Sequence, residues 1–383
     1  MRKSSVLGGV VAGVMALGVA SLAAQDEGVQ IHGFATQGFV VSSNNNYLGM
    51  PTRNFSPGWT EAAVNLNDNV GDKLRVGLQL HYTHLGAFGG EEPAIDWALA
   101  DYRARPWLGI RAGKVKIRWG LYNDTQDYDP GYLWALLPEP MYAVDWRSTD
   151  LAQTGVEVYG RVGLGKKLGK LDYSVYDGGY CDATNDGIVE GYLEEGLTFT
   201  HVPCGKTPGG DLRWSPPVHG LKVGASLMVY NASGTLTDGT LREPNTFWPT
   251  VYAQYDFHKA FFSGQLMKLV EYDIATEAGS APEVDASDNR AWFAMGGYHL
   301  TNKFEAGAYY TRNLDVSAGD NSDPGSYFHD WVVSGRYDFS AFAYAKLEGH
   351  FIDGTGLGFY DFDNPGDLKP HTAVVVTKIG FTF

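Results

Sequence analysis

Apolar and polar side chains alternate along much of this chain with a period of two. Such alternation is typical of a β-strand whose two faces meet different surroundings, since successive side chains point to opposite faces. Segments of about ten residues with this pattern recur, and we predict an all-β fold of about sixteen antiparallel strands. The predicted strands lie near residues 28–42, 58–68, 72–84, 94–103, 107–118, 150–163, 168–180, 209–216, 220–231, 246–257, 259–273, 288–300, 303–313, 326–338, 341–353 and 371–383.

The connections between these strands are alternately short and long. The tight ones fall at residues 69–71, 104–106, 165–167, 217–219, 258, 301–302 and 340. The others are rich in Gly, Pro, Asn and Asp, and they span residues 43–57, 85–93, 119–149, 181–208, 232–245, 274–287, 314–325 and 354–370. This rhythm is typical of a transmembrane antiparallel β-barrel with short periplasmic turns and long extracellular loops. A β-sandwich would not be expected to alternate its loop lengths so regularly.

Within the clearest segments, the ionisable side chains share one face. In residues 72–84 the outward set is predicted to be Leu74, Val76, Leu78, Leu80 and Tyr82, and the inward set Arg75, Gln79, His81 and Thr83. In residues 94–103, Asp96 is predicted to face inward, opposite Ile95, Trp97 and Leu99. A charge that faces lipid near the membrane midplane costs roughly 2–4 kcal/mol, so this segregation is meaningful. Sixteen strands enclose more space than side chains fill, and we expect the polar faces to line water.

The first residues have the composition of an export signal. Arg2 and Lys3 are basic, residues 6–20 form an uncharged apolar run, and Ser21 and Ala23 are small residues of the kind that a signal peptidase reads. We predict a cleaved signal peptide over residues 1–23 and a single barrel domain over residues 24–383. A membrane anchor helix is the alternative, but the run is short for a span of about 20 residues.

The last predicted strand ends on an aromatic residue. Val375, Ile379, Phe381 and Phe383 fall on one face of it. This ending resembles the closing-strand signal of outer-membrane barrels, in which a terminal Phe is presented to the barrel-assembly machinery. An open apolar edge strand invites aggregation, whereas barrel closure pairs it with the first strand. The expected partners are that machinery, outer-membrane lipid and lipopolysaccharide, and the expected location is the outer membrane of a Gram-negative bacterium.

Charge and hydropathy exclude two other classes of protein. The chain carries 44 acidic and 29 basic residues, for a formal net charge of −15. Nucleic-acid binding needs a basic footprint, so we expect no nucleic-acid partner. Downstream of the export signal there is no apolar stretch of about 18 residues, which excludes a membrane protein built from helices.

Residues 107–149 contain the best candidates for a pore constriction. Lys114, Lys116 and Arg118 share one face of the predicted strand, and we expect them to point into the lumen as a ladder. The long loop 119–149 is expected to fold inward and to present Asp124, Asp127, Asp129 and Glu139. Further basic residues predicted to line the pore are Arg75, Arg147 and Arg161. Opposed charges would create a transverse field that orients polar solutes. The alternative is an ordinary extracellular loop, with cations that only hydrate the barrel wall.

Residues 113–120, GKVKIRWG, resemble the G-Q-x-K-x-P-F-G element of the phosphate-selective porin O/P group. The matching positions are Gly113, Lys116 and Gly120, with Trp119 in place of Phe. Lys114 replaces Gln, and Arg118 replaces Pro. The resemblance implies a Gram-negative outer-membrane porin that lets ions and small hydrophilic solutes diffuse through a water-filled pore. It also implies a homotrimer, and a ladder of inward cations that attracts anions. The acidity of the chain opposes an anion preference.

Cys181 and Cys204 are the only cysteines, and both lie in the predicted loop 181–208. In an oxidising periplasm they are expected to form a disulfide that constrains this loop. Two free thiols, or a metal site with His201, are the alternatives. We predict no metal site and no cofactor, although extracellular carboxylates could bind divalent cations that bridge lipopolysaccharide.

The sequence contains no motif of a catalytic site. Ser334, Asp330 and His329 lie close together in sequence, but His329 is predicted to point to the opposite face of its strand from the other two, so they do not form a catalytic set. No G-x-S-x-G, H-E-x-x-H or P-loop pattern occurs. We therefore predict no enzyme. A non-conducting adhesin or a structural outer-membrane barrel is the alternative function, because loop sequence alone does not separate binding from gating.

Overall fold

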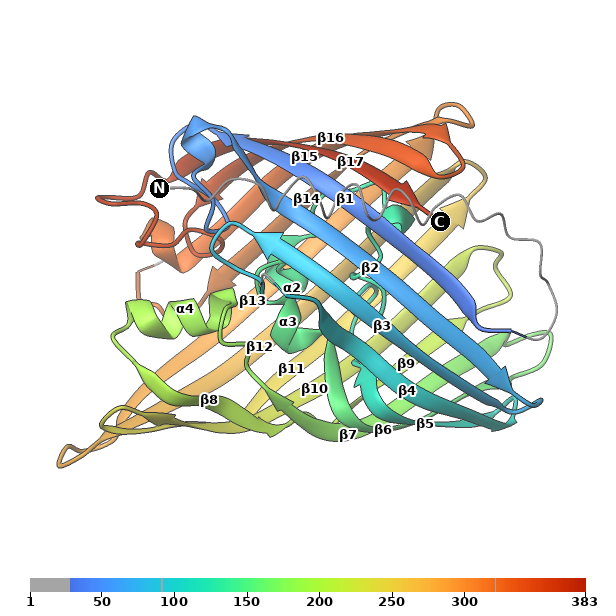
Figure 1. Ribbon diagram of the computed structural model, residues 1–383, viewed down its shortest axis with the longest axis horizontal. Helices are drawn as coiled ribbons and strands as arrows, with labels where there is room; N and C mark the ends of the chain where they lie inside the picture. Colours follow the sequence, from blue (N-terminus) through green and yellow to red (C-terminus); the bar gives the residue numbers. More distant parts are fainter. Residues whose placement is uncertain (1–27, 91, 321) are drawn as a thin grey trace, which may run out of the picture.

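The computed structural model describes residues 28–90, 92–320 and 322–383, so the predicted signal peptide 1–23 lies outside the described residues. The strands form one antiparallel barrel (Figure 1). They are β1 (Gln30–Ser42), β2 (Ser56–Val70), β3 (Leu74–Leu85), β4 (Ala94–Arg105), β5 (Leu108–Lys116), β6 (Ala152–Gly163), β7 (Lys170–Cys181), β8 (Phe199–Lys206), β9 (Gly209–Ser215), β10 (Leu221–Leu236), β11 (Gly239–Phe257), β12 (Ala260–Glu277), β13 (Glu283–His299), β14 (Phe304–Asp315), β15 (Tyr327–Ser340), β16 (Ala343–Gly354) and β17 (His371–Thr382).

Short helices occupy some of the connections. They are η1 (Thr52–Asn54), η2 (Asp129–Gly131), α2 (Glu139–Tyr142), α3 (Arg147–Asp150), α4 (Gly187–Glu194) and η3 (Pro324–Ser326). Within the part of the chain that the structure describes, no helix is both long and apolar enough to cross a membrane.

The barrel closes through the first and last strands. β1 pairs with β17 on one side and with β2 on the other. β8 and β9 share one position between β7 and β10, because the strand is interrupted at Thr207 and Pro208. Proline cannot donate to the ladder of hydrogen bonds, so an interruption at this point is expected. The 17 strand segments therefore occupy sixteen positions, and the predicted fold class, a closed antiparallel barrel of about sixteen strands, is confirmed.

The two faces of the barrel differ as the alternation predicted. Apolar side chains are exposed on the outer face, as in Val156 (50%), Leu347 (59%) and Trp331 (63%). Polar side chains between them face inward and are buried, as in Glu157 and Glu348. One part of the prediction is wrong: Trp97 lies opposite the inward-facing Gln79, because the pairing of β3 with β4 shifts by one residue at this point. A one-residue shift reverses the faces, so Trp97 and Leu99 belong to the inner face.

The ends of the barrel differ in the length of their connections. The end with the tight turns is called the short-turn end, and the opposite one, at the left of Figure 1, the long-loop end. At the long-loop end, residues 232–245 and 274–287 were predicted to be loops, but they continue β10 to β13 as hairpins. Inward-facing Leu236 and Leu241 are buried there against Tyr192 of α4, which explains why these polar stretches remain in the sheet.

Candidate pore constriction

The segment between β5 and β6, residues 117–151, lies inside the barrel, and Figure 1 shows α2 and α3 within the ring of strands. β5 ends at Lys116, two residues earlier than predicted, and the chain then turns away from the barrel wall. Apolar side chains of this inward loop pack against the inner faces of β10 to β17 in two clusters. The loop therefore spans the lumen and divides it between the long-loop end and the short-turn end.

The first part of the inward loop is attached to β10, β11 and β12. Among the hydrogen bonds that hold it there, Trp119 Nε1 donates to the Trp248 carbonyl (2.8 Å), Gly120 N to Ser226 Oγ (3.0 Å), and Leu121 N to Gln265 Oε1 (3.0 Å). Gly120 has a φ of 61°, and a Cβ at this position would lie 2.5 Å from the hydroxyl oxygen of Tyr142. Only glycine accommodates this turn without displacing its neighbours.

The middle of the inward loop is attached to β16 and β17 by buried charges. Asp129 accepts from Lys346 (3.0 Å), Lys378 (2.9 Å) and Tyr344 (2.6 Å). Burial alone would raise the pKa of Asp129, but the two ammonium groups outweigh it and hold this pKa well below its usual value. Close by, the carboxylate of Glu348 accepts hydrogen bonds from two backbone N–H groups of the loop, those of Ala135 (3.0 Å) and Leu136 (2.8 Å).

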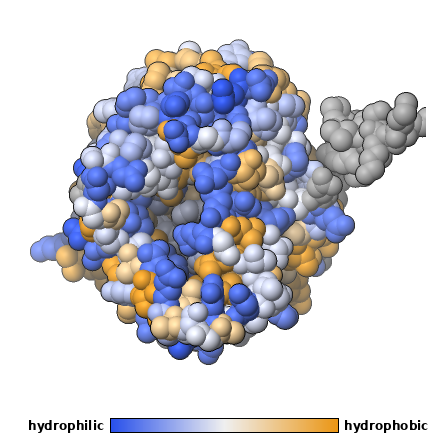
Figure 2. Space-filling view, turned by 90° about the vertical axis from the view of Figure 1, so that its left-hand side faces the viewer, coloured by the Kyte–Doolittle hydropathy of each residue, from blue (hydrophilic) through white to orange (hydrophobic). Residues whose placement is uncertain are grey.

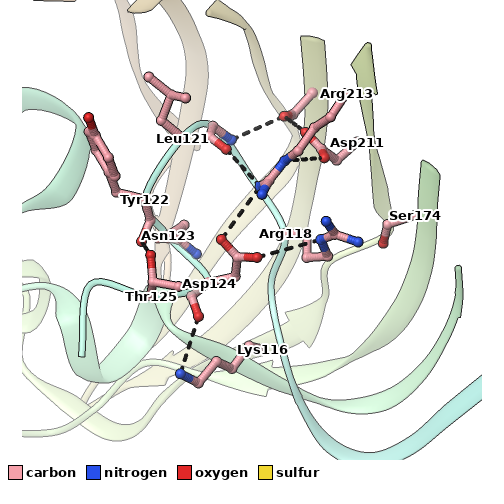
Figure 3. A network of polar contacts seen from close by, with 12 residues as sticks. Lys116, Arg118, Leu121, Tyr122, Asn123, Asp124, Thr125, Ser174, Asp211 and Arg213 are labelled. Carbon is pink, nitrogen blue, oxygen red and sulfur yellow. Dashed lines mark hydrogen bonds and ion pairs between the residues drawn. The ribbon is translucent and has the colours of Figure 1, made fainter. Parts of the chain in front are cut away.

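Arginines and carboxylates alternate along the inner face from β4 to β9. This charge chain consists of Asp101, Arg111, Glu157, Arg118, Asp124, Arg213 and Asp211. Its successive N···O distances are 3.0, 2.9, 3.9, 3.5, 3.4 and 2.8 Å. Figure 3 shows Asp124 of the inward loop between Arg118 and Arg213, with Lys116 close to its backbone carbonyl. The three arginine side chains are 16–28% exposed, so they keep part of their surface toward the lumen.

Lys114, Lys116 and Arg118, which were predicted to form one ladder, each have different interaction partners. Lys116 pairs with Asp127 at 2.6 Å, and Arg118 belongs to the charge chain. Lys114 donates to the carbonyl of Ile95 on β4 at 2.8 Å and has no ion pair in the described residues. The predicted ladder is therefore not formed, because β5 ends at Lys116 and the chain changes direction before Arg118.

The other predicted basic residues lie at different depths. Arg147 in α3 is 5% exposed and pairs with Asp96 at 2.5 Å, where it helps to attach the inward loop to β4. Arg75 donates to Asn67 near the short-turn end, and Arg161, also near that end, pairs with Asp172. Arg147 is therefore part of the inward loop, whereas Arg75 and Arg161 lie away from it.

Glu139 differs from the other predicted acidic residues of the loop. It is 4% exposed, and no Lys or Arg pairs with it in the described part of the chain. Burial, together with the neighbouring Asp145 carboxylate, raises the pKa of Glu139 well above its usual value. The Glu139 side chain is buried and faces no basic partner among the described residues, so the expectation that it presents a charge to the lumen is corrected. Asp124, Asp127 and Asp129, in contrast, all lie within 3.5 Å of a basic group.

Sequence reasoning missed several residues that hold the loop and form the charge chain. Arg111 lies opposite Asp101 on β4 and Glu157 on β6, in the inward phase of β5. The inward assignment of Glu157 could have identified it, had the strands been paired. Lys346 and Lys378 also face inward, but their partner Asp129 is more than 200 residues away in sequence. No local pattern points to such a contact.

Cys181 and Cys204 form a disulfide. They lie directly opposite each other at the paired ends of β7 and β8, rather than within a loop as predicted. In residues 28–90, 92–320 and 322–383, no group of three or more His, Cys, Asp or Glu side chains is arranged to hold a metal ion.

Phe381 of β17 and Phe383, directly after this strand, are 51% and 48% exposed. The backbone of Phe383 exchanges two hydrogen bonds of 3.0 Å with Gly33 of β1. A Cβ on Gly33 would lie 2.4 Å from the Phe383 ring, so the ring covers the space that this glycine leaves open. Their predicted role in barrel assembly stays a prediction.

The fold is a closed barrel of sixteen strand positions with a loop inside it, and solved structures of outer-membrane channels have the same fold. OmpT of Vibrio cholerae is similar with a TM-score of 0.56 and 12% identity, over 94% of this chain and 99% of that one. An anion-selective porin from Comamonas acidovorans has a TM-score of 0.57 and 12% identity, over 94% and 100% of the two chains. The outer-membrane channel DcaP of Acinetobacter baumannii has a TM-score of 0.56 and 11% identity, over 95% and 100%. No family model and no curated protein matches the sequence. At this identity, the similarities establish the fold alone.

Proposed function

We propose that the protein is a porin of the Gram-negative outer membrane, which lets ions and small hydrophilic solutes diffuse passively across it. The observation that carries the proposal is the segregation of the two faces of the closed barrel. The outer face exposes large apolar side chains, including Val251 (51%), Leu266 (60%) and Phe351 (59%), which suit lipid and not water. The inner face carries the charge chain, whose groups need water or partners.

The inward loop supports a role for this barrel as a selective channel. Its attachments to β10 to β12, to β16 and β17 and, through Arg147, to β4 fix its position in the lumen. Fixed charges beside a narrow passage act on permeating ions more strongly than the same charges in bulk water. We propose that the partly exposed Arg111, Arg118 and Arg213, with their carboxylate partners, form the polar surface along which solutes pass.

A preference of the channel for phosphate is implied only by the resemblance of residues 113–120 to the element of the phosphate-selective porin O/P group. Lys116 and Arg118 are ion-paired, so each offers an anion less than a full positive charge. We therefore propose a channel with weak selectivity between small inorganic ions. The homotrimer also follows from the resemblance, and we propose it as the assembly in the membrane, to be tested by cross-linking the detergent-extracted protein.

Single-channel recording in a planar lipid bilayer tests the proposed function. We expect stepwise conductance that rises in proportion to the salt concentration. Arg213→Gln should change the reversal potential in a salt gradient, because it removes one of the three cations of the charge chain. Arg161→Gln is the matched control: this arginine is 62% exposed and lies near the short-turn end, so the reversal potential should not change.

A non-conducting adhesin or structural barrel is the competing function. Correctly folded protein, identified by a heat-modifiable band in gel electrophoresis, would then insert into the bilayer without conductance steps. That result would overturn the proposal of a channel and leave the fold unaffected.

A further inference from the structure

A second polar site lies between the inward loop and the long-loop end. It is a cavity of about 290 Å³, bounded by α3, the end of β7, α4 and the outermost parts of β10 to β13. Figure 2 shows this end of the molecule, which is hollowed near its middle and surrounded by hydrophilic side chains. We call this cavity the acidic chamber. None of its residues belongs to the charge chain.

The acidic chamber is lined by carboxylates without balancing cations. Besides Glu195, the acidic side chains are those of Asp150, Asp182, Glu243, Glu271, Asp273 and Asp285. No Lys, Arg or His is among the described residues that line it. Elsewhere inside the barrel the buried carboxylates are mostly paired with bases, as Asp129 and Asp127 are. Seven acidic groups in one enclosed space, with no base among the described lining residues, favour a positively charged ligand.

Acceptors without partners point to the same conclusion independently of the charge. Asp182 is 6% exposed, and its Oδ2 has no hydrogen-bond partner among the described residues, although the side chain lines the chamber. Thr246 is 1% exposed, and its Oγ1 likewise has no partner in the part of the chain that the structure describes. Buried acceptors are normally satisfied, so unpaired ones that converge on a cavity indicate a missing donor.

Aromatic side chains complete the chamber. They are Trp146, Tyr180, Tyr192, Tyr230 and Trp248. The ring centroids of Tyr180 and Tyr230 are 4.9 Å apart, and those of Tyr230 and Trp248 are 6.0 Å apart, so the three rings form one continuous surface. Two of the tyrosine hydroxyls orient carboxylates: Tyr230 donates to Asp150 at 2.5 Å and Tyr192 to Glu243 at 3.2 Å.

This combination selects an organic cation over a metal ion. Aromatic faces attract ammonium and guanidinium groups through cation–π interactions, whereas a hydrated metal ion gains little from them. The described carboxylates are also not grouped closely enough to coordinate a metal. The volume is at the lower end of the range for small-molecule sites, which limits the ligand to a short, compact molecule.

We propose that the acidic chamber binds small organic cations that carry ammonium or guanidinium groups, and that it concentrates this class of solute at the entrance of the channel. Binding itself does not depend on the proposed function; only the role at the entrance rests on it. The proposed function places the long-loop end outside the cell, so the site receives solute before the inward loop does.

Isothermal titration calorimetry on the full chain in detergent tests the binding. The probe is agmatine, a short chain with one guanidinium and one ammonium group. We expect saturable binding that is at least tenfold tighter than that of 4-guanidinobutyrate, in which a carboxylate replaces the ammonium. Equal affinity for the two compounds, or no binding of agmatine, would overturn the inference without the use of any variant.

Substitutions locate the site. The double variant Asp182→Asn with Glu271→Gln should bind agmatine at least tenfold more weakly than the unchanged protein, because two acidic groups that can ionise against a bound cation are replaced by amides of the same shape. Asp367→Asn, which changes an exposed loop carboxylate outside the chamber, should bind as the unchanged protein does. Equal affinity in the double variant would overturn the assignment to this chamber.

Conductance of the same preparation separates the two proposals. Agmatine added on the long-loop side should reduce the current at lower concentration than agmatine added on the other side. Conductance with no agmatine binding would refute the chamber and leave the channel. Binding without conductance would refute the channel and leave the chamber.

Discussion

Asp129 is the residue whose replacement should most clearly separate the inward loop from the barrel wall. It lies in the loop and joins Lys346 of β16 to Lys378 of β17. Asp129→Asn keeps the size of the side chain but removes the charge. The strands stay paired with one another through their backbones, so we expect the barrel to remain closed while the loop loosens.

The free-energy cost of Asp129→Asn depends on the partners that Lys346 and Lys378 keep in the variant. Removing one partner of a buried ion pair typically costs about 3–5 kcal/mol. Lys378 keeps its pair with Glu61 at 2.9 Å, and Lys346 keeps the carbonyls of Asp129 and Trp134, both at 2.8 Å. The cost should therefore be near the lower end, about 3 kcal/mol. That corresponds to a shift of about a hundredfold in the equilibrium between detached and attached loop.

Hydrogen exchange at two amides measures this equilibrium directly. The N–H groups of Ala135 and Leu136 donate to Glu348 only while the loop is attached, so their exchange should become about a hundredfold faster in Asp129→Asn. Asp172→Asn is the control, because it removes an ion pair whose Arg161 partner is 62% exposed, and such pairs contribute little. Unchanged exchange at both amides in Asp129→Asn would refute the reasoning.

Acidification should loosen the loop only at very low pH. The pKa of Asp129 is held below its unfolded value, so its stabilising contribution is complete above about pH 4. That contribution is lost as the pH falls from there toward the lower pKa of the folded state. An attachment that weakened between pH 7 and pH 5 would show that a different group controls it.

Three further predictions concern charge, covalent constraint and proton linkage. Replacing Lys114, Lys116 and Arg118 with Glu should shift the reversal potential toward cation preference, and an unchanged potential would remove them from the selectivity of the channel. Reduction of Cys181–Cys204 removes about 3 kcal/mol of constraint, in a chain-entropy estimate, yet the heat-modifiable band should persist. Loss of that band would show that the disulfide holds the barrel itself. Burial raises the pKa of Asp150 to about 6 and of Asp182 to about 9, so agmatine should bind more tightly, with release of protons, as the pH rises from 5 to 8. An affinity for agmatine that does not change with pH would contradict this linkage. The other titratable groups that face Asp150 and Asp182 are Asp186, Glu195, Glu243, Glu271, Asp273, Asp285, Tyr180, Tyr192 and Tyr230.

The strands could be predicted because their pattern is local. Each side chain of a barrel strand faces either the outside or the inside of the barrel, and its polarity indicates which. Most strand boundaries therefore fall within a few residues of those predicted. The exceptions arise because tertiary packing keeps a segment in the sheet although its local composition is typical of a loop. The hairpin between β10 and β11 looks like a polar loop, yet Leu236 and Leu241 bury its inner face. β8 was missed because apolar and polar residues are mixed in it and it contains a proline, Pro203.

The candidate site was less predictable, because it depends on pairing between distant segments. The sequence identified the inward loop and its aspartates, but not the partners on the opposite strands. Lys378, for example, reaches Asp129 only after the last strand is in place. Arg111 was also missed: Lys114 and Lys116 drew attention, while the position of Arg111 between Asp101 and Glu157 is visible only once the register is known.

The pairing of β1 with β17 makes closure of the barrel depend on the presence of β17. Nine successive residues of β1 find their partners in the last strand of the chain. A ribosome that stalled before residue 371 would release a product with two unsatisfied edges, on β1 and β16, and such edges recruit other chains. Copies that lack β17 would therefore remain accessible to proteases, whereas copies that contain it would gain the protection of a closed barrel.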